Sequence, residues 1–174
     1  MHERLGQPAL NNIGYASNTA SMFTNKSLKP LPPLPKDTDP VMGENLALHR
    51  PVSASNTRGN TTQFIPERAL DGNPKTYWAT NDKVTTATFE LDMENPVDVN
   101  AVELAEVMEL GPRIQAYKVE GQVNSDWKLL SQGTTVGARK VDKFPTETVW
   151  KVKITITKAS GYVALKKVGL YLQK

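Results

Sequence analysis

The stretch Trp150-Lys151-Val152-Lys153-Ile154-Thr155-Ile156 alternates apolar and polar side chains at every position. A period of two residues places successive side chains on opposite faces of a β-strand. The stretch therefore predicts a strand whose apolar residues, Trp150 included, face a core while its lysines face solvent. The stretch Thr86-Ala87-Thr88-Phe89-Glu90-Leu91-Asp92 shows the same alternation and predicts a second such strand.

Further short apolar segments continue this pattern along the chain. They lie at residues 102–104, 117–119, 127–130 and 163–172. Turn-forming residues separate them, at residues 71–74, 94–96, 111–112, 124–126 and 160–161. No long stretch has the period of an α-helix. Short strands at this spacing are typical of two-sheet folds, so we predict an all-β domain, a jelly-roll β-sandwich, over residues 44–174.

Residues 1–43 differ from the rest because they hold six of the 12 prolines. The stretch Lys29-Pro30-Leu31-Pro32-Pro33-Leu34-Pro35 predicts an extended polyproline II conformation, since each proline ring fixes φ and removes a backbone donor. We interpret residues 1–43 as an extended N-terminal arm with a semi-rigid Pro-rich linker, the tail of an upstream region. The alternative is a ligand for a proline-recognising domain. Residues 1–30 contain no apolar segment of the kind that a secretory signal requires.

The composition argues against several classes of function. The chain has 174 residues and no cysteine, which excludes a disulfide framework, a thiolate nucleophile and a cysteine-based zinc site. His2 and His49 are the only histidines, too few for most histidine-based catalytic or zinc sites. A net charge of +3 is too small to indicate nucleic acid binding, and no run of 18 apolar residues predicts a membrane span. We therefore expect a binding or structural domain rather than an enzyme.

The C-terminal region is basic, with six lysines and no acidic residue among the last 24 residues. These lysines are consistent with a patch for a polyanionic glycan or nucleic acid, or with the solvated face of two strands. Lys151 and Lys153 alternate with apolar residues, which favours the solvated face.

Several motifs carry a family resemblance. The stretch Ala69-Leu70-Asp71-Gly72-Asn73-Pro74-Lys75-Thr76-Tyr77-Trp78 is the most recognisable, and Asn45-Leu46-Ala47 and Phe89-Glu90-Leu91-Asp92 fit strands before and after it. On these residues the chain resembles the discoidin, or coagulation-factor type C, domain, a galactose-binding-like jelly roll. Further motifs resemble the discoidin-type domain that follows the catalytic barrel in some bacterial and plant α-L-fucosidases. They lie at residues 55–60, 77–82, 110–113, 133–137, 144–145 and 168–171.

The resemblance covers about residues 44–174 and implies a discoidin-like jelly-roll β-sandwich. It also implies a non-catalytic carbohydrate-binding accessory module of a secreted bacterial glycoside hydrolase, located outside the cell or in the periplasm. The implied partners are a fucose- or galactose-containing glycan and the catalytic domain of the same polypeptide. We expect no catalysis by this chain, because the sequence contains no counterpart of the fucosidase barrel with its catalytic carboxylates.

The stretch Asp71-Gly72-Asn73 predicts a tight turn in which Asp and Asn side chains bond their own backbone. The resemblance implies a structural calcium ion at this turn, held by Asp71, Asn73, Thr76, carbonyl oxygens and an acidic residue on the last strand. In this sequence Lys167 stands at that acidic position. Three states stay open: a bound calcium ion, an oxygen cage filled by the Lys167 ammonium, or an empty cage.

The jelly roll predicts that several loops meet at one end of the sandwich. A glycan site there requires polar side chains for the sugar hydroxyls and an apolar platform for the C–H face. The histidine that follows the motif tryptophan in many related sugar binders is absent, and Arg113 directly precedes a predicted strand, which favours a structural role. The predicted glycan-binding residues are Arg58, Asn60, Tyr77, Asn81, Asp82, Glu106, Glu109 and Tyr162. We expect Trp78, Trp127 and Trp150 in the core.

Three other functions compete with glycan binding. The first is a structural strut that packs on a catalytic domain and has no sugar site of its own. The second is lipid or cell-surface binding, which requires apolar loop residues such as Met108 and Ile65 beside basic ones. The third is glycoside hydrolysis with Glu106, Glu109 and Asp82 as acid and base. The third is least favoured, because the resemblance assigns catalysis to a different domain.

Overall fold

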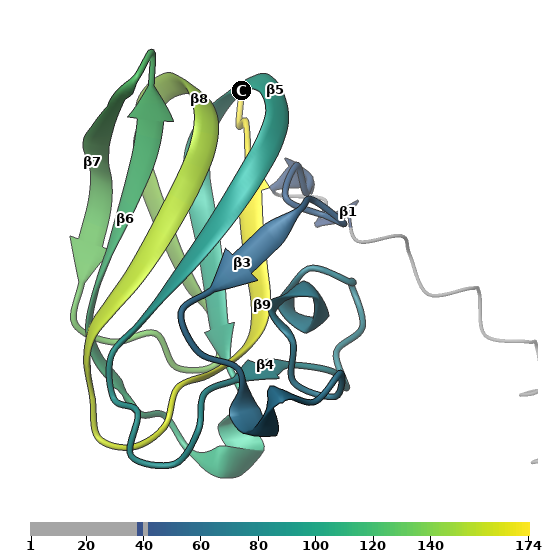
Figure 1. The fold of residues 1–174 in the computed structure, drawn as a ribbon. Coiled ribbons are helices and arrows are strands. Elements are labelled where there is room, and N and C mark those ends of the chain that lie inside the picture. The colour runs from purple at the N-terminus through teal and green to yellow at the C-terminus, as the bar shows by residue number, and fades with distance from the viewer. Residues whose placement is uncertain (1–37, 40–41) are drawn as a thin grey trace, which may run out of the picture. The chain divides into compact units, whose positions relative to one another are not determined.

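The computed structural model describes residues 38–39 and 42–174. Its strands are β1 (Thr38–Asp39), β2 (Gly43–Glu44), β3 (Val52–Ala54), β4 (Trp78–Ala79), β5 (Ala87–Glu106), β6 (Ile114–Val123), β7 (Asp126–Gly133), β8 (Lys140–Ala159) and β9 (Ala164–Tyr171). Short 3-10 helices lie between them: η2 (Arg58–Asn60), η3 (Pro66–Ala69) and η4 (Met108–Leu110). The described ranges contain no α-helix, and the predicted all-β class is confirmed (Figure 1).

Strands β5 and β8 contribute to both layers of the sandwich, because each is 20 residues long and bends near its middle. In one layer, residues 87–92 of β5 pair with β3 and with the second half of β8, which also pairs with β6, and β6 pairs with β7. In the other layer, β5 from residue 97 onward pairs with the first half of β8 and with β9, and β9 pairs with β4. All these pairings are antiparallel, and Figure 1 shows both long strands curving over between the layers.

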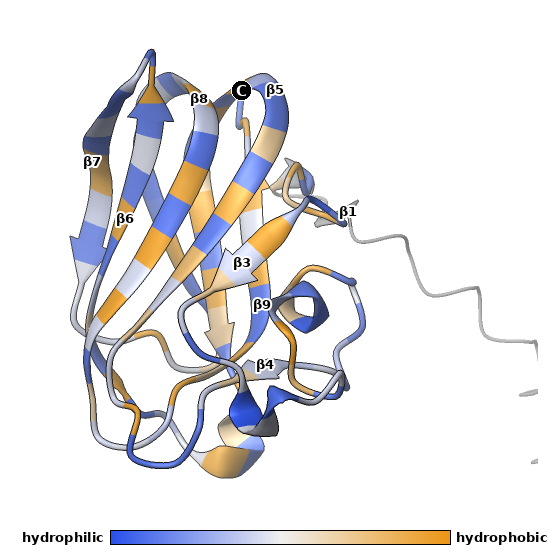
Figure 2. Ribbon diagram, viewed as in Figure 1, coloured by the Kyte–Doolittle hydropathy of each residue, from blue (hydrophilic) through white to orange (hydrophobic). Residues whose placement is uncertain are grey.

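The core fills the space between the two layers. Figure 2 shows hydrophobic and hydrophilic bands alternating along β5 and β8, as the sequence predicts for half-buried strands. Phe89 of β5 and Ile154 of β8 are fully buried and opposite each other in register. Trp78 packs against Phe89 with ring centroids 5.1 Å apart, and its indole N–H donates a 2.9 Å hydrogen bond to the Asn56 carbonyl. The expected core position of Trp78 is therefore confirmed.

The expected core positions of Trp150 and Trp127 are wrong. Trp150 is 45% exposed, because the register of β8 against β5 shifts between Val149 and Lys151 and Val149 takes the inner position instead. Trp127 is half-buried, and its ring lies 4.0 Å from the Lys153 ammonium. Lysine covers this ring with a cation–π contact, so Trp127 belongs to the outer face of its layer.

The predicted N-terminal arm lies almost wholly outside the described residues, and its polyproline stretch is entirely outside them. Of residues 1–43, the structure describes β1 and part of the segment that follows, which pairs with it through β2. Met42 is buried and packs against Ala101 and Tyr171. The described fold thus includes residues just before position 44, where we predict the domain to begin. Within residues 38–39 and 42–174, no helix has the length and apolar character needed to cross a membrane.

Several loops between strands gather at one end of the sandwich, at the bottom of Figure 1, opposite the turn between β6 and β7. They comprise residues 55–65, 80–86, 107–113 and 160–163, and we call this region the loop end. The predicted convergence of loops is confirmed by contacts among them, since Arg58 forms an ion pair with Asp82 and lies against the Tyr162 ring.

Candidate functional site

Glu106 is a buried carboxylate that bonds backbone N–H groups of two loops. It is the last residue of β5 and only 2% exposed. Its Oε1 accepts hydrogen bonds from the backbone N–H groups of Arg113 at 2.7 Å and Ile114 at 3.0 Å, and its Oε2 accepts one from Gly137 at 2.8 Å. A buried carboxylate whose oxygens already accept three bonds has little capacity left for a sugar hydroxyl. The prediction that Glu106 binds glycan is therefore wrong, because it lies inside the strand and holds backbone.

Arg58 connects the loop after β3 with the loop after β4. Its Nη1 lies 2.8 Å from Asp82 Oδ1 and donates to the Thr80 carbonyl at 3.2 Å. Hydrogen bonding to Asp82 raises the pKa of the Arg58 guanidinium, and partial burial opposes the rise. Asn81 reinforces the connection, because its Oδ1 accepts a 2.7 Å bond from the Gly59 N–H. The structure thus brings together three predicted site residues, Arg58, Asn81 and Asp82.

Tyr162 lies next to two guanidinium groups. The ring centroid is 4.4 Å from Arg58 Cζ and 4.1 Å from Arg113 Cζ. Both distances are within the range of cation–π contacts. Arg113 is a candidate site residue that the sequence reasoning placed in a structural role. The residues that meet at this ring are far apart in the chain, and no local pattern in the sequence reveals their contact.

Apolar side chains form the floor of the loop end. The Phe64 and Tyr77 rings lie 5.2 Å apart, and with Leu110 and Tyr162 they pack partly buried against Ala79, Val107 and Ala164. Tyr77 is therefore part of this cluster rather than an exposed platform. Met108 on η4 is the most exposed large apolar side chain of the loop end, at 40%.

The two remaining predicted residues lie on the rim. Asn60 and Glu109 are exposed, on η2 and η4. Asn60 has a φ of 49°, in the left-handed region that asparagine tolerates better than most residues. Of the eight predicted residues, five therefore lie in the contact between the Arg58 and Asp82 loops or in the apolar floor, two lie on the rim, and Glu106 is buried.

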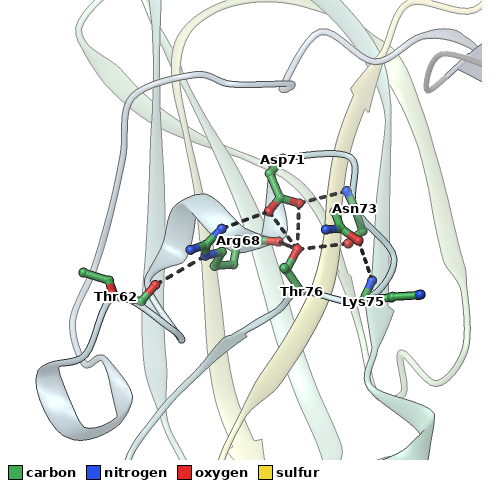
Figure 3. Close-up of polar contacts among 6 residues, drawn as sticks. All are labelled: Thr62, Arg68, Asp71, Asn73, Lys75 and Thr76. Atoms are coloured by element: carbon green, nitrogen blue, oxygen red, sulfur yellow. Dashed lines mark hydrogen bonds and ion pairs between the residues drawn. The ribbon is translucent and has the colours of Figure 1, made fainter.

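The Asp71 turn is a separate polar cluster, drawn in Figure 3. The Thr76 hydroxyl lies 2.8 and 2.7 Å from the two Asp71 carboxylate oxygens, 3.0 Å from the Asn73 carbonyl and 3.4 Å from the Arg68 carbonyl. Asp71 Oδ1 also accepts a 2.8 Å bond from the Asn73 N–H, and Asn73 Oδ1 accepts one from the Lys75 N–H at 3.0 Å. The predicted self-bonded tight turn is confirmed.

The donors of this turn do not complete a calcium site. Calcium prefers six to eight oxygen ligands. The turn gathers five: the Thr76 hydroxyl, both Asp71 carboxylate oxygens and the Asn73 and Arg68 carbonyls. The Arg68 guanidinium, 3.8 Å from Asp71, already balances that carboxylate. Within residues 38–39 and 42–174, no group of three or more acidic, histidine or cysteine side chains is placed to hold a metal ion.

Lys167 does not fill the cage either. Its ammonium lies 3.3 Å from Glu103 Oε2, on the adjacent strand β5. Of the three states left open for this turn, the cage filled by the Lys167 ammonium is therefore not the one in the structure. The motif correctly indicates that Lys167 lies on the last strand. The direction of its flexible side chain depends on Glu103, its partner on the adjacent strand.

The chain is similar to a known domain family and to two plant proteins. The family model for the F5/8 type C domain matches residues 51–168. The chain is 24% identical over 177 residues to alpha-L-fucosidase 1 of Arabidopsis thaliana, covering 99% of this chain and 35% of that protein. It is 22% identical over 172 residues to putative alpha-L-fucosidase 1 of Oryza sativa subsp. japonica, covering 98% and 33%. The chain thus spans about a third of the length of these curated relatives.

Solved structures give the same architecture. A GH29 fucosidase of Ruminococcus gnavus in complex with fucose superposes with a TM-score of 0.70 at 29% identity, covering 75% of this chain and 27% of that one. Chitosan-binding module 2 of a chitosanase/glucanase from Paenibacillus sp. IK-5, in complex with chitotriose, superposes with a TM-score of 0.66 at 20% identity. That match covers 74% of this chain and 100% of the module, and it supports the fold alone.

Proposed function

The chain belongs to the F5/8 type C domain family, and from this premise we propose that it is a carbohydrate-binding accessory module that binds glycan at the loop end. The discoidin-type fold and the resemblance predicted from the sequence are confirmed. The proposed parent is a secreted glycoside hydrolase related to α-L-fucosidases, with the catalytic domain in the same polypeptide. The module then acts outside the cell or in the periplasm, where it raises the local concentration of the enzyme on its substrate.

One observation carries the proposal: polar side chains with fixed positions surround half-buried aromatic rings at the loop end. Arg58, Asn81 and Asp82 are held by mutual contacts between loops. Arg58 places its donors beside the Tyr162 ring, and Asp82 and Asn81 lie on the loop that contacts the Arg58 loop. Sugar recognition requires this combination, because hydroxyl groups need hydrogen-bond partners and the C–H face of the ring needs apolar surface. Fucose- or galactose-containing glycans are the proposed ligands.

The same contacts argue against catalysis by the loop-end carboxylates. A glycosidase needs one carboxyl group as acid and a second as base or nucleophile. The Glu106 carboxylate is engaged by three backbone N–H groups, and Asp82 forms an ion pair with Arg58. We therefore propose that the chain recognises glycan and that any hydrolysis takes place in another domain.

A glycan array tests this function on the chain. We expect binding to a subset of glycans, and loss of that binding in Arg58→Ala and Asp82→Ala. The matched control is Glu90→Ala, which removes a carboxylate from an ion pair with Lys151 on the outer face, 3.5 Å apart. Binding that survives in the loop-end variants, or that disappears in Glu90→Ala as well, would contradict a site at the loop end.

The alternative function is a structural strut that packs its loop end on a catalytic domain. The observation that favours it is the exposed Met108 side chain at the same loop end as a cluster of partly buried apolar side chains. An exposed apolar side chain beside a partly buried cluster is also what a domain contact buries. No binding on the array by a folded chain would select the strut.

A further inference from the structure

Arg113 has a backbone that is fixed on both sides. Its N–H donates to the buried Glu106 carboxylate at 2.7 Å, and its carbonyl accepts a 2.9 Å bond from the Ser160 N–H. These contacts tie the loop after β5 to the loop before β9. The position from which the Arg113 side chain extends is therefore set before any ligand arrives.

The Arg113 side chain is also held in place. Its guanidinium lies 4.1 Å from the Tyr162 centroid. Its stem passes Gly161, where an added Cβ would lie 3.3 Å from Arg113 Cδ. That separation is tighter than ordinary van der Waals contact, so a glycine at this position leaves the stem its space. Stacking and backbone bonds together give the guanidinium a defined location with little rotamer freedom left to lose on binding.

The two arginines beside Tyr162 differ in what accepts their hydrogen bonds. Arg58 donates to Asp82 and to the Thr80 carbonyl. In the part of the chain that the structure describes, no carboxylate or carbonyl accepts a hydrogen bond from the Arg113 guanidinium. A guanidinium offers five N–H donors in a planar fork. Arg113 thus keeps its donors available at the surface of the candidate site.

We propose that Arg113 binds an anionic group of the glycan, a carboxylate or a sulfate ester, so that the site takes acidic sugars. This inference rests on the proposed function and adds the class of ligand. The planar fork of arginine matches carboxylate and sulfate oxygens in a bidentate way, and such charge-assisted bonds are stronger than neutral ones. Lys83 is an exposed cation on the neighbouring segment of residues 80–86 of the loop end, Asp82 is engaged by Arg58, and Glu109 lies on the rim.

Pairs of sugars with and without an ionised group test whether the site takes acidic glycans. The probes are trigalacturonate and its fully methyl-esterified form, with a sulfated and an unsulfated fucose oligosaccharide as a second pair, titrated calorimetrically into the full chain. We expect each acidic member to bind roughly 10- to 100-fold more tightly than its neutral partner. This preference should shrink as salt is raised from about 0.05 to 0.5 M, because surface charges are screened.

Two variants connect the preference to Arg113. Arg113→Gln should bring the acidic and neutral members of a pair to within about twofold, and Arg113→Lys should keep part of the preference because it keeps the charge but loses the fork. The matched control is Lys75→Gln, which removes one positive charge from a side chain that Figure 3 shows pointing away from the Asp71 turn. It should keep the full preference, and all three variants should melt within a few degrees of the parent chain.

The possible outcomes separate the two proposals. Equal binding of acidic and neutral members, or an acidic preference that survives in Arg113→Gln, would overturn the acidic ligand and leave glycan binding in place. No binding of any glycan by the folded chain, here and on the array, would overturn both.

Discussion

Two buried glutamates of β5 lie three positions apart and are satisfied in opposite ways. Glu103 is 3% exposed and is surrounded by side chains: Arg139 Nε at 2.6 Å, the Tyr171 hydroxyl at 2.8 Å and the Lys167 ammonium at 3.3 Å. Glu106 is 2% exposed, and its bonds come from backbone N–H groups. Glu103 therefore joins the buried Tyr171 hydroxyl and two partly exposed cations, Arg139 and Lys167, whereas Glu106 determines the path of two loops.

The difference indicates which of the two carboxylates holds the backbone of the loop end in place. Arg139 and Lys167 are partly exposed, with side-chain exposures of 49% and 28%, so both can hydrate if Glu103 is lost. Two of the three backbone N–H groups that bond Glu106 belong to Arg113 and Ile114, and the third belongs to Gly137 in the loop between β7 and β8. These backbone groups cannot turn toward water as a long side chain can once the carboxylate is removed. We expect the first carboxylate to affect stability alone and the second to affect both stability and the shape of the loop end.

The largest effect is expected from Glu106→Ala. Removing the carboxylate leaves three backbone N–H groups without their partner, two of them at the start of β6. Buried donors without acceptors are costly, and we expect the free energy of unfolding to fall by about 3–5 kcal/mol. Urea denaturation monitored by tryptophan fluorescence measures it. A loss below about 1 kcal/mol would show that solvent replaces Glu106 easily, and the contrast between the two glutamates would fail.

A smaller effect is expected from Glu103→Gln. The amide oxygen still accepts from the buried Tyr171 hydroxyl, and the two cations turn toward water. We expect a loss of about 1–2 kcal/mol in the same urea experiment. Glycan binding should be unchanged, whereas the matched variant Glu106→Gln should weaken it, because one amide oxygen cannot accept from both loops. Equal effects of Glu103→Gln and Glu106→Gln on glycan binding would show that the two carboxylates do not differ in their effect on the loop end.

Tyr117 is a buried residue whose neutral hydroxyl, rather than a charged group, bonds a carboxylate. The Tyr117 hydroxyl donates a 2.6 Å bond to Asp142, and burial, followed by this bond, raises the pKa of Tyr117 above its ordinary value of 10.0. A pKa raised in the folded state means that the unfolded chain loses its proton first. This contribution to stability is therefore present below about pH 10 and falls as the pH rises beyond it, by at most about 1.4 kcal/mol per pH unit.

Tyr117→Phe isolates this titration. The stability of the parent chain should fall more steeply than that of the variant between pH 9.5 and 11, as measured by urea denaturation at each pH. The variant itself should be about 1 kcal/mol less stable at pH 7, because Asp142 loses a hydrogen bond. Parallel pH profiles would show that Tyr117 titrates equally in both states.

The smallest effect is expected from calcium. The Asp71 carboxylate is already bonded by Thr76 and by the Asn73 N–H, and Arg68 lies near it. The melting temperature should therefore change by less than about 1 °C between EDTA and millimolar calcium chloride, because an ion that does not bind the native state does not stabilise it. Lys167→Glu should stay equally unresponsive, since the Asp71 carboxylate keeps its bonds to Thr76 and the Asn73 N–H in that variant. A rise of several degrees in either protein would restore the calcium site.

The sequence was sufficient for the strands and for the family, because both depend on local pattern. Alternation in residues 86–92 and 150–156 predicts half-buried strands, and most of those side chains lie on the predicted face. Trp150 breaks the pattern because the long strand bends and its register shifts there, which depends on pairing with a distant segment. Local periodicity carries no information about that pairing.

The candidate site was predictable as a set of loops but not as a set of contacts. Arg58, Asp82 and Tyr162 lie on loops that the jelly roll brings to one end, and the structure places them in contact. Glu106 was expected in a loop because the sequence does not show that β5 continues for 20 residues. The positions of Arg113 and Lys167 depend on partners across the fold, Tyr162 and Glu103, which a single sequence does not identify.

The most direct test of a glycan site at the loop end is a chemical-shift titration of the 15N-labelled chain with 2′-fucosyllactose and with trigalacturonate. For whichever probe binds, we expect perturbed amides to cluster in residues 57–60, 80–83, 107–113 and 160–163, with trigalacturonate perturbing those of Gly111 and Arg113 most. We expect no change at the Asp71 turn or on the outer face around Trp127. Perturbations concentrated at either of those places, or none with either probe at millimolar concentration, would contradict a glycan site at the loop end.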